Sequence, residues 1–372
     1  MTLRLSRDLM ELGLDGELNE RISELGSSFI GEDTVLALDI SDIQKPYAKK
    51  MEYLEKVLDG SEGEIGNGYW FVGVTGADIR REGVIPLHNH LYSSIAPDFE
   101  SENKEMLKAV DMVCGKVGSR GIWVIDRGGD RRTLFKELIK RKLRFVIRLV
   151  GSRSAGTSTG SVGGEGLVTD TILNLSRTLK TPYQTQVIRI KEGYEDKFNI
   201  QLGSCKVRLD FYSEPLTLVV LKGFGEKPMM LLTNLEVEET KKGAWKVVEI
   251  YLLRWKCEET FRFIKQSYNL EDIRVRGYQS LKNMVALILS VAFFVAIFLG
   301  RTLRLKILYQ CECIKRKVIV ISRRFFGIPL FCYYAISDGV FRIFNRFPIK
   351  KPPKQIDQIQ MLQLEIPLFS DS

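Results

Sequence analysis

The sequence predicts an α/β protein with a mixed sheet, flanking helices and a mostly antiparallel β insertion. Short apolar runs bounded by turn residues alternate with segments of helical periodicity up to about residue 150. Residues 151–166 are rich in glycine, serine and threonine, and the segments from 167 to about 235 alternate or are β-branched. Helical periodicity then returns at 245–266 and 280–305. Together these observations place a β-rich segment inside an α/β chain.

The first half of the chain follows the order strand, strand, strand, helix, strand, helix, strand. We expect these strands at 35–38, 69–74, 83–87, 122–125 and 145–147, and the two helices at 102–116 and 130–141. This order of elements is that of a ribonuclease-H-like core.

The pattern divides the chain into five predicted regions. They are a short N-terminal helical segment (1–34), the first part of a ribonuclease-H-like core (35–150), a β-rich insertion (151–244), the second part of that core with the helix that carries Glu258 (245–300) and a basic C-terminal region (301–372). The core is therefore expected to form from two segments that the insertion separates.

The composition is that of a globular protein with an uneven charge. Of the 372 residues, 45% are hydrophobic and 27% are charged, which excludes a disordered chain, a collagen and a small disulfide scaffold. The net charge is +9, but residues 301–354 hold 13 basic and 2 acidic residues, and the remainder holds 42 basic and 44 acidic residues. A basic segment beside a near-neutral body indicates a polyanionic partner, either nucleic acid or an anionic membrane surface.

Cysteine and histidine usage excludes a recognisable zinc site. None of the six cysteines lies in a C-x-x-C pair, and the chain has only two histidines. Reduced cysteines and the absence of a signal-peptide pattern at the N-terminus predict a cytoplasmic protein.

One apolar segment raises the alternative of a membrane protein. Residues 284–299 carry no charge, but they are fewer than the roughly 20 residues that cross a bilayer. We therefore expect a helix buried in the core. The alternative is a membrane-attached protein that uses 284–300 with the basic flank 301–324.

Two aspartates follow predicted strands of the core. The first strand stops at Asp39 and the fourth stops at Asp126. Sites in open α/β sheets lie beyond the carboxyl ends of the strands, so these carboxylates are expected to converge. Asp42, three residues after Asp39, is the alternative ligand, and Asp39 is favoured because it directly follows the apolar run.

The predicted helix at 245–266 carries a stripe of functional side chains. At about 100° per residue, Tyr251, Arg254, Glu258 and Lys265 fall within roughly 60° of arc. A carboxylate beside two cations and a phenol suits a metal-bound phosphodiester, since the acid binds the metal and the other groups bind phosphate oxygens. A solvated face with helical ion pairs explains the spacing as well.

The spacing Y-x2-R-x3-E-x6-K resembles the signature of bacterial insertion-sequence transposases of the fourth family. The segments 35–41 and 122–130 also resemble that family's motifs around its first and second aspartates, and 145–148 resembles the strand that follows. The β-rich insertion lies between the second aspartate and the glutamate, as in those enzymes. The resemblance covers roughly residues 33–300 and implies a DDE transposase with a ribonuclease-H-like fold.

The resemblance also implies a mechanism. Asp39, Asp126 and Glu258 would hold two divalent ions, Mg²⁺ with Mn²⁺ as a substitute, for two-metal phosphodiester cleavage at element ends and strand transfer. In the family the freed 3′-hydroxyl forms a hairpin that is later reopened. The implied partners are double-stranded DNA, at element ends and target, and a second copy of the chain on the paired ends. A membrane is not implied, and the expected location is the bacterial cytoplasm, at the nucleoid.

Four residues are the candidates for phosphate or DNA contacts: Tyr251, Arg254, Lys265 and Arg148. For Arg148, pairing with DNA and pairing with a carboxylate both stay open, and Lys45 and Tyr47 are expected to contact DNA. Only 38 residues precede Asp39, fewer than in the family. The alternative function is therefore a truncated, catalytically idle relic that only binds DNA or oligomerises.

Overall fold

The computed structural model describes residues 13–299, except 59, 61–62, 79–82, 159–166, 192–193, 224 and 274. The predictions for residues 1–12 and for the basic region 301–372 lie outside the described residues.

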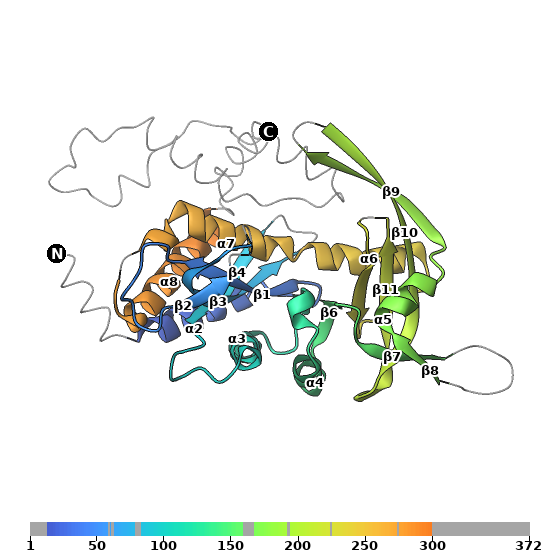
Figure 1. Ribbon diagram of the computed structural model, residues 1–372, viewed down its shortest axis with the longest axis horizontal. Helices are drawn as coiled ribbons and strands as arrows, with labels where there is room; N and C mark the ends of the chain where they lie inside the picture. The colour runs from blue at the N-terminus through green and yellow to red at the C-terminus, as the bar shows by residue number, and fades with distance from the viewer. Residues whose placement is uncertain are drawn as a thin grey trace, which may run out of the picture.

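Twelve strands and ten helical segments occur in the described part of the chain (Figure 1). The strands are β1 (Val35–Gln44), β2 (Glu55–Leu58), β3 (Ile65–Ala77), β4 (Val84–Tyr92), β5 (Ile122–Ile125), β6 (Arg144–Arg148), β7 (Ser154–Ser158), β8 (Leu167–Thr171), β9 (Tyr183–Lys191), β10 (Tyr194–Leu209), β11 (Tyr212–Lys222) and β12 (Met229–Thr233). The helices are α2 (Leu14–Ser27), α3 (Glu102–Val117), α4 (Arg132–Lys140), α5 (Ile172–Thr178), α6 (Lys241–Leu252), α7 (Trp255–Ser267) and α8 (Tyr278–Phe293). Short helical segments are η1 (Arg127–Gly129), η2 (Leu270–Asp272) and η3 (Phe294–Leu299).

The core sheet has the order β4-β3-β1-β5-β6. The first three strands in sequence pair antiparallel, because β3 lies between β1 and β4. The strands β5 and β6 then run parallel to β1, each reached through a helix, α3 or α4. This order and these directions are those of a ribonuclease-H-like fold, and they confirm the predicted α/β class.

Strands of the predicted insertion extend this sheet rather than forming a separate one. The strand β12 pairs antiparallel with β6, and β11 and β10 continue the order outward. Figure 1 shows β7 to β11 at the end of the molecule away from α8. The five regional boundaries themselves stay a prediction.

Helices cover both faces of the core sheet. Side chains alternate along a strand, so Val35 and Val124 pack with α6, while Leu36, Trp123 and Phe145 pack with α3 and α4. Figure 1 shows α6 and α7 running end to end along one side of the sheet, with α3 and α4 on the other side. By the same alternation Asp39, four residues after Val35, lies on the side of α7.

The strand β1 is longer than predicted. The apolar run ends at Leu38, but antiparallel pairing with β3 continues through Gln44, so Asp39 lies inside the strand. The parallel pairing of β1 with β5 does end at Leu38 and Ile125. The expected end of the strand at Asp39 is therefore wrong for the pairing of β1 with β3, which continues to Gln44. It is correct for the pairing of β1 with β5.

The predicted continuous helix at 245–266 is divided into α6 and α7. Around the junction, three backbone bonds span three residues: Arg254 N to Tyr251 O, Lys256 N to Leu253 O and Cys257 N to Arg254 O. Such bonds tighten the turn to 120° per residue instead of 100°. Over three residues this rotates the rest of the helix by roughly 60° relative to the predicted stripe.

The apolar segment 284–299 belongs to one helical stretch, α8 with η3. These 22 residues, Tyr278–Leu299, are long and apolar enough to cross a membrane, with a mean hydropathy of 2.2. In the structure 61% of that segment's most apolar window is buried, and α8 packs against α2 and β4. That packing is the one expected of a core helix.

Candidate functional site

The centre of the site is an arginine that joins two carboxylates. Arg254, at the junction of α6 and α7, donates from Nη1 to Asp39 Oδ2 at 2.9 Å and from Nη2 to Glu258 Oε1 at 2.6 Å. The arginine side chain is 9% exposed, and those of Asp39 and Glu258 are 14% and 32% exposed. One planar guanidinium therefore holds a carboxylate of β1 and a carboxylate of α7 at the same place.

The second predicted aspartate lies on the neighbouring parallel strand. Leu38 of β1 pairs with Ile125 of β5, so Asp39 and Asp126 each follow the last shared pair. The backbone turns into η1 at Asp126, whose Oδ1 accepts a hydrogen bond from Gly128 N at 2.7 Å. This turn fixes the carboxylate of Asp126 at the end of β5.

The three carboxylates affect one another electrostatically. Burial raises the pKa of Asp39 to about 7 against the lowering effect of Arg254, and the charges of Asp126 and Glu258 raise it further. Burial alone would lower the pKa of Arg254, but Asp39, Tyr251 and Glu258 raise it above its ordinary value. The site thus gathers three acidic groups around one permanent cation, which leaves an excess of negative charge.

Two buried polar atoms beside this cluster have no hydrogen-bond partner among the described residues. They are Tyr251 Oη and Arg254 Nε. Tyr251 is 2% exposed, and its ring centroid lies 5.9 Å from Cζ of Arg254. Buried donors in folded proteins are nearly always paired, so two unpaired donors at one place call for a partner. A ligand oxygen would be a suitable partner for both.

The fourth residue of the predicted stripe lies elsewhere. Lys265 Nζ is 3.5 Å from Asp42 Oδ1 and 4.0 Å from Glu271 Oε1. Lys265 is 11 residues after Arg254 in the sequence, about 16 Å along a helix axis at 1.5 Å per residue, so the two side chains do not meet. Asp42, the alternative ligand, also accepts a bond from Gln44 Nε2, and the structure groups it with Lys265 rather than with Glu258.

Arg148 ends β6, one strand beyond Asp126. Ile147 pairs with Ile125, so Arg148 follows the same row of the sheet as Asp39 and Asp126. Among the described residues its side chain has no carboxylate partner.

Lys45 corrects an expectation from the sequence. Its side chain is buried, and Nζ donates to the backbone oxygens of Leu270, Glu271 and Ile273 at 2.6, 3.1 and 3.0 Å. A lysine with all three protons engaged cannot contact DNA, so Lys45 fastens η2 to β1 instead. Tyr47, in contrast, is 77% exposed.

The donor chemistry of the site fits a hard divalent cation. Carboxylate oxygens are the ligands that Mg²⁺ and Mn²⁺ prefer, and the excess negative charge is what such an ion neutralises. In the described part of the chain, however, no three acidic, histidine or cysteine side chains are close enough to share one ion. Arg254 lies between Asp39 and Glu258, so the side chains must rearrange before both acids can bind the same ion.

Sequence reasoning predicted the acids and Arg254 but not the arginine's bonds to both carboxylates. Those bonds depend on the junction of α6 and α7, which no residue pattern announced. It also missed a pocket formed by the loops at 45–51 and 271–276. The signal for that pocket is the segment Lys-Pro-Tyr-Ala-Lys-Lys at 45–50, which places three lysines around one tyrosine.

Comparisons with known proteins gave a family match and a similar solved structure. The sequence model of the family described as Transposase DDE domain matches residues 101–294, which contain Asp126 and Glu258. Among solved structures, one similar chain is the piggyBac transposase in a cryo-EM structure of its synaptic complex with hairpin DNA. The two chains are 11% identical with a TM-score of 0.42, and the match covers 92% of this chain and 59% of that one. A search of curated proteins gave no match.

The family match covers more than half of the chain, and it spans α3 to α8 of the fold described above. The chain therefore belongs to the transposase DDE domain family.

Proposed function

We propose that this chain is a DNA transposase that cleaves phosphodiester bonds at the ends of a mobile element and joins the freed ends to target DNA. The observation that carries the proposal is the arrangement of Arg254 between Asp39 and Glu258, next to Asp126. The family match supports the reaction class, and the Y-x2-R-x3-E-x6-K spacing supports the fourth insertion-sequence family with its hairpin intermediate.

In this proposal Asp39, Asp126 and Glu258 hold the divalent ions, Mg²⁺ by preference and Mn²⁺ as a substitute. When bound, the ions lower the pKa of the attacking water or 3′-hydroxyl and stabilise the charge on the leaving oxygen. Asp39 lies in β1, Asp126 directly follows β5 and Glu258 lies in α7, so the sheet and the helix position the three acids.

The other predicted residues orient the DNA. Tyr251 Oη and Arg254 Nε are donors without partners in the described structure, which suits them to a phosphate oxygen at the reacting bond. The absence of a carboxylate partner for Arg148 in the described residues favours its role in binding DNA over ion pairing. Lys265 holds a phosphate farther along α7, next to Asp42. The substrate is double-stranded DNA, and the active form is a homodimer on paired ends in the bacterial cytoplasm.

The experiment is incubation of the purified chain with linear DNA that carries the native element ends, with and without Mg²⁺. Cleavage at the ends with Mg²⁺, and its absence with a chelator, is the expected result. Binding of the ends without cleavage under any divalent ion would instead favour the catalytically idle relic.

A further inference from the structure

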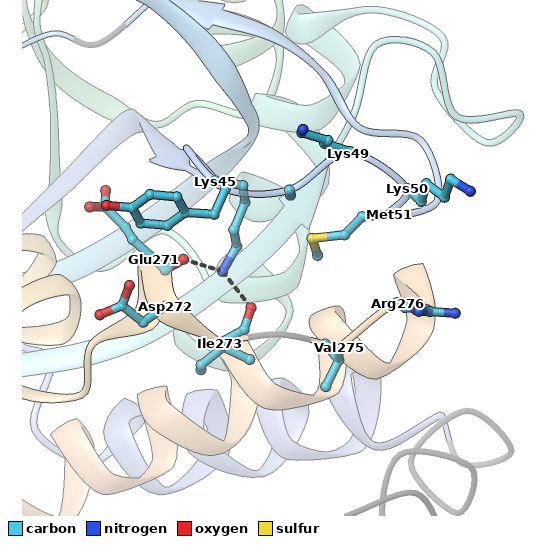
Figure 2. Close-up of a pocket in the computed structure, with 11 residues that line it drawn as sticks. Lys45, Lys49, Lys50, Met51, Glu271, Asp272, Ile273, Val275 and Arg276 are labelled. Carbon is cyan, nitrogen blue, oxygen red and sulfur yellow. Dashed lines mark hydrogen bonds between the residues drawn. The ribbon is translucent and has the colours of Figure 1, made fainter.

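A pocket of about 580 Å³ lies between the loops 45–51 and 271–276 (Figure 2). It begins where β1 ends, six residues beyond Asp39. At roughly 3.3 Å per residue, the pocket is about 20 Å along the strand from that carboxylate. It is therefore separate from the carboxylate site and begins at the end of the strand that carries Asp39.

The two walls of the pocket are fastened to each other at both ends. At one end Lys45 Nζ donates to three backbone oxygens of residues 270–273, as Figure 2 shows for two of them. At the other end Glu52 N donates to Arg276 O at 3.1 Å, and Tyr278 N donates to Glu52 Oε2 at 2.7 Å. A ligand would thus meet a preformed pocket and would not have to order its walls.

Charge is distributed unevenly around the pocket. Figure 2 shows Lys50 and Arg276 on one side and Glu271 and Asp272 on the opposite side, with Met51 among the residues between them. Lys49, Lys50 and Arg276 are exposed, and none has an ion-pair partner among the residues that the structure describes.

The middle of the pocket is apolar, and an aromatic ring stands at its edge. Met51, Ile273 and Val275 contribute apolar walls, and Tyr47 lines the pocket with 77% of its surface exposed. Its volume is within the range of pockets that bind small organic molecules. A suitable ligand is a flat, uncharged group with an anion attached at one end.

We propose that this pocket binds one unpaired nucleotide of the DNA substrate, an inference that rests on the proposed function. The phosphates lie against Lys49, Lys50 and Arg276, and the base stacks on Tyr47. The carboxylates of Glu271 and Asp272 keep phosphate out of the far end and accept hydrogen bonds from a base's amino group. A duplex is too wide for such a pocket, so it selects a strand that is locally single.

The test measures binding of the full-length chain, without divalent ions, to a labelled twelve-nucleotide oligodeoxycytidine and to a duplex of equal length. Fluorescence anisotropy gives both affinities. Tyr47→Ala should weaken single-strand binding roughly tenfold, the scale of one lost stacking contact, with little change for the duplex. Tyr47→Phe retains the ring and should bind like the unaltered chain.

The salt dependence of single-strand binding tests the role of Lys49 and Lys50. Replacing Lys49 and Lys50 together with glutamine should lower the slope of log affinity against log salt by about 1.4 for the single strand. Lys136→Gln, an exposed lysine on α4 outside the pocket, is the matched control and should not reproduce that change.

Equal single-strand affinities for Tyr47→Ala and the unaltered chain would overturn the inference, and so would an equal loss on duplex DNA. Cleavage of element ends by the unaltered chain is measured separately. If the chain cleaves and Tyr47→Ala binds normally, only the pocket assignment is wrong. If Tyr47→Ala loses single-strand binding but the chain never cleaves, the pocket assignment stands and the transposase proposal is wrong.

Discussion

Arg254 connects two segments of the chain that are 215 residues apart in sequence. Its guanidinium bonds Asp39 and Glu258, and of these three side chains Arg254 and Asp39 are largely buried while Glu258 is partly exposed. Removing one partner of a buried ion pair leaves the remaining charges uncompensated, which costs more than the pair itself contributes. Arg254 therefore stabilises the free protein in the position where a bound cation would neutralise the same carboxylates.

Arg254→Gln tests this role at the scale of one residue. In the absence of divalent ions the free energy of unfolding should fall by about 3–5 kcal/mol, the usual cost of breaking a buried pair. Mg²⁺ should raise the melting temperature of Arg254→Gln more than that of the unaltered chain, since the ion no longer competes with a guanidinium. Calorimetry with and without Mg²⁺ measures both effects, and an equal response to Mg²⁺ in the two proteins would contradict this role.

Close packing of α7 on β3 positions Glu258 opposite Asp39. Gly73 of β3 pairs with Asp39 of β1, and the ring of Phe261 from α7 lies directly over Gly73. A Cβ at Gly73 would overlap that ring. The absence of a side chain at this glycine therefore sets how near α7 approaches the strand that carries Asp39.

Gly73→Ala should displace Phe261 and with it α7. The expected cost is about 1–3 kcal/mol of stability, as for other overpacked sites, together with a loss of cleavage. Gly115→Ala is the control, because a Cβ there meets nothing within 4 Å and alanine favours the helix α3. Chemical denaturation should show Gly115→Ala slightly stabilised, and a Gly73→Ala protein of unchanged stability would show that α7 tolerates displacement.

The elements differ in how well the sequence predicts them. The strand at 122–125 is predicted at its observed bounds, because four apolar residues are buried on both faces. The end of β1 is not predicted at its observed position, because Asp39, Ser41 and Asp42 are polar and their place in the strand depends on pairing with β3. The strand β2 is missed for a similar reason, since its glycine-rich surroundings resemble a loop.

The sequence likewise predicts some features of the candidate site and misses others. Local patterns identify Asp39, Asp126 and Glu258 as acids near strand ends and on a helix. The bonds made by Arg254, the pairing of Lys265 with Asp42 and the burial of Lys45 depend on contacts across more than 200 residues. Such contacts follow from the packing of whole elements, which no local periodicity encodes.

At the scale of the whole molecule, the net positive charge comes from residues 301–354, which lie beyond the described structure. If this region contacts the DNA backbone, deletion of 301–372 should flatten the salt dependence of DNA binding by about 0.9 in log–log slope per lost phosphate contact. Filter binding at several salt concentrations measures the slope. An unchanged slope in a folded truncation would make the region a packing element instead.

The central claim is that the carboxylate of Glu258 acts in catalysis. The most direct measurement compares cleavage of element ends by Glu258→Gln and Glu259→Gln in Mg²⁺. Glutamine at 258 still accepts a bond from Arg254 but lacks the charge that holds a cation, so cleavage should fall by several orders of magnitude while DNA binding persists. Glu259 pairs with Lys256 and not with Arg254, so Glu259→Gln should retain most activity. Equal activities of the two variants, or normal cleavage by Glu258→Gln, would contradict the catalytic assignment.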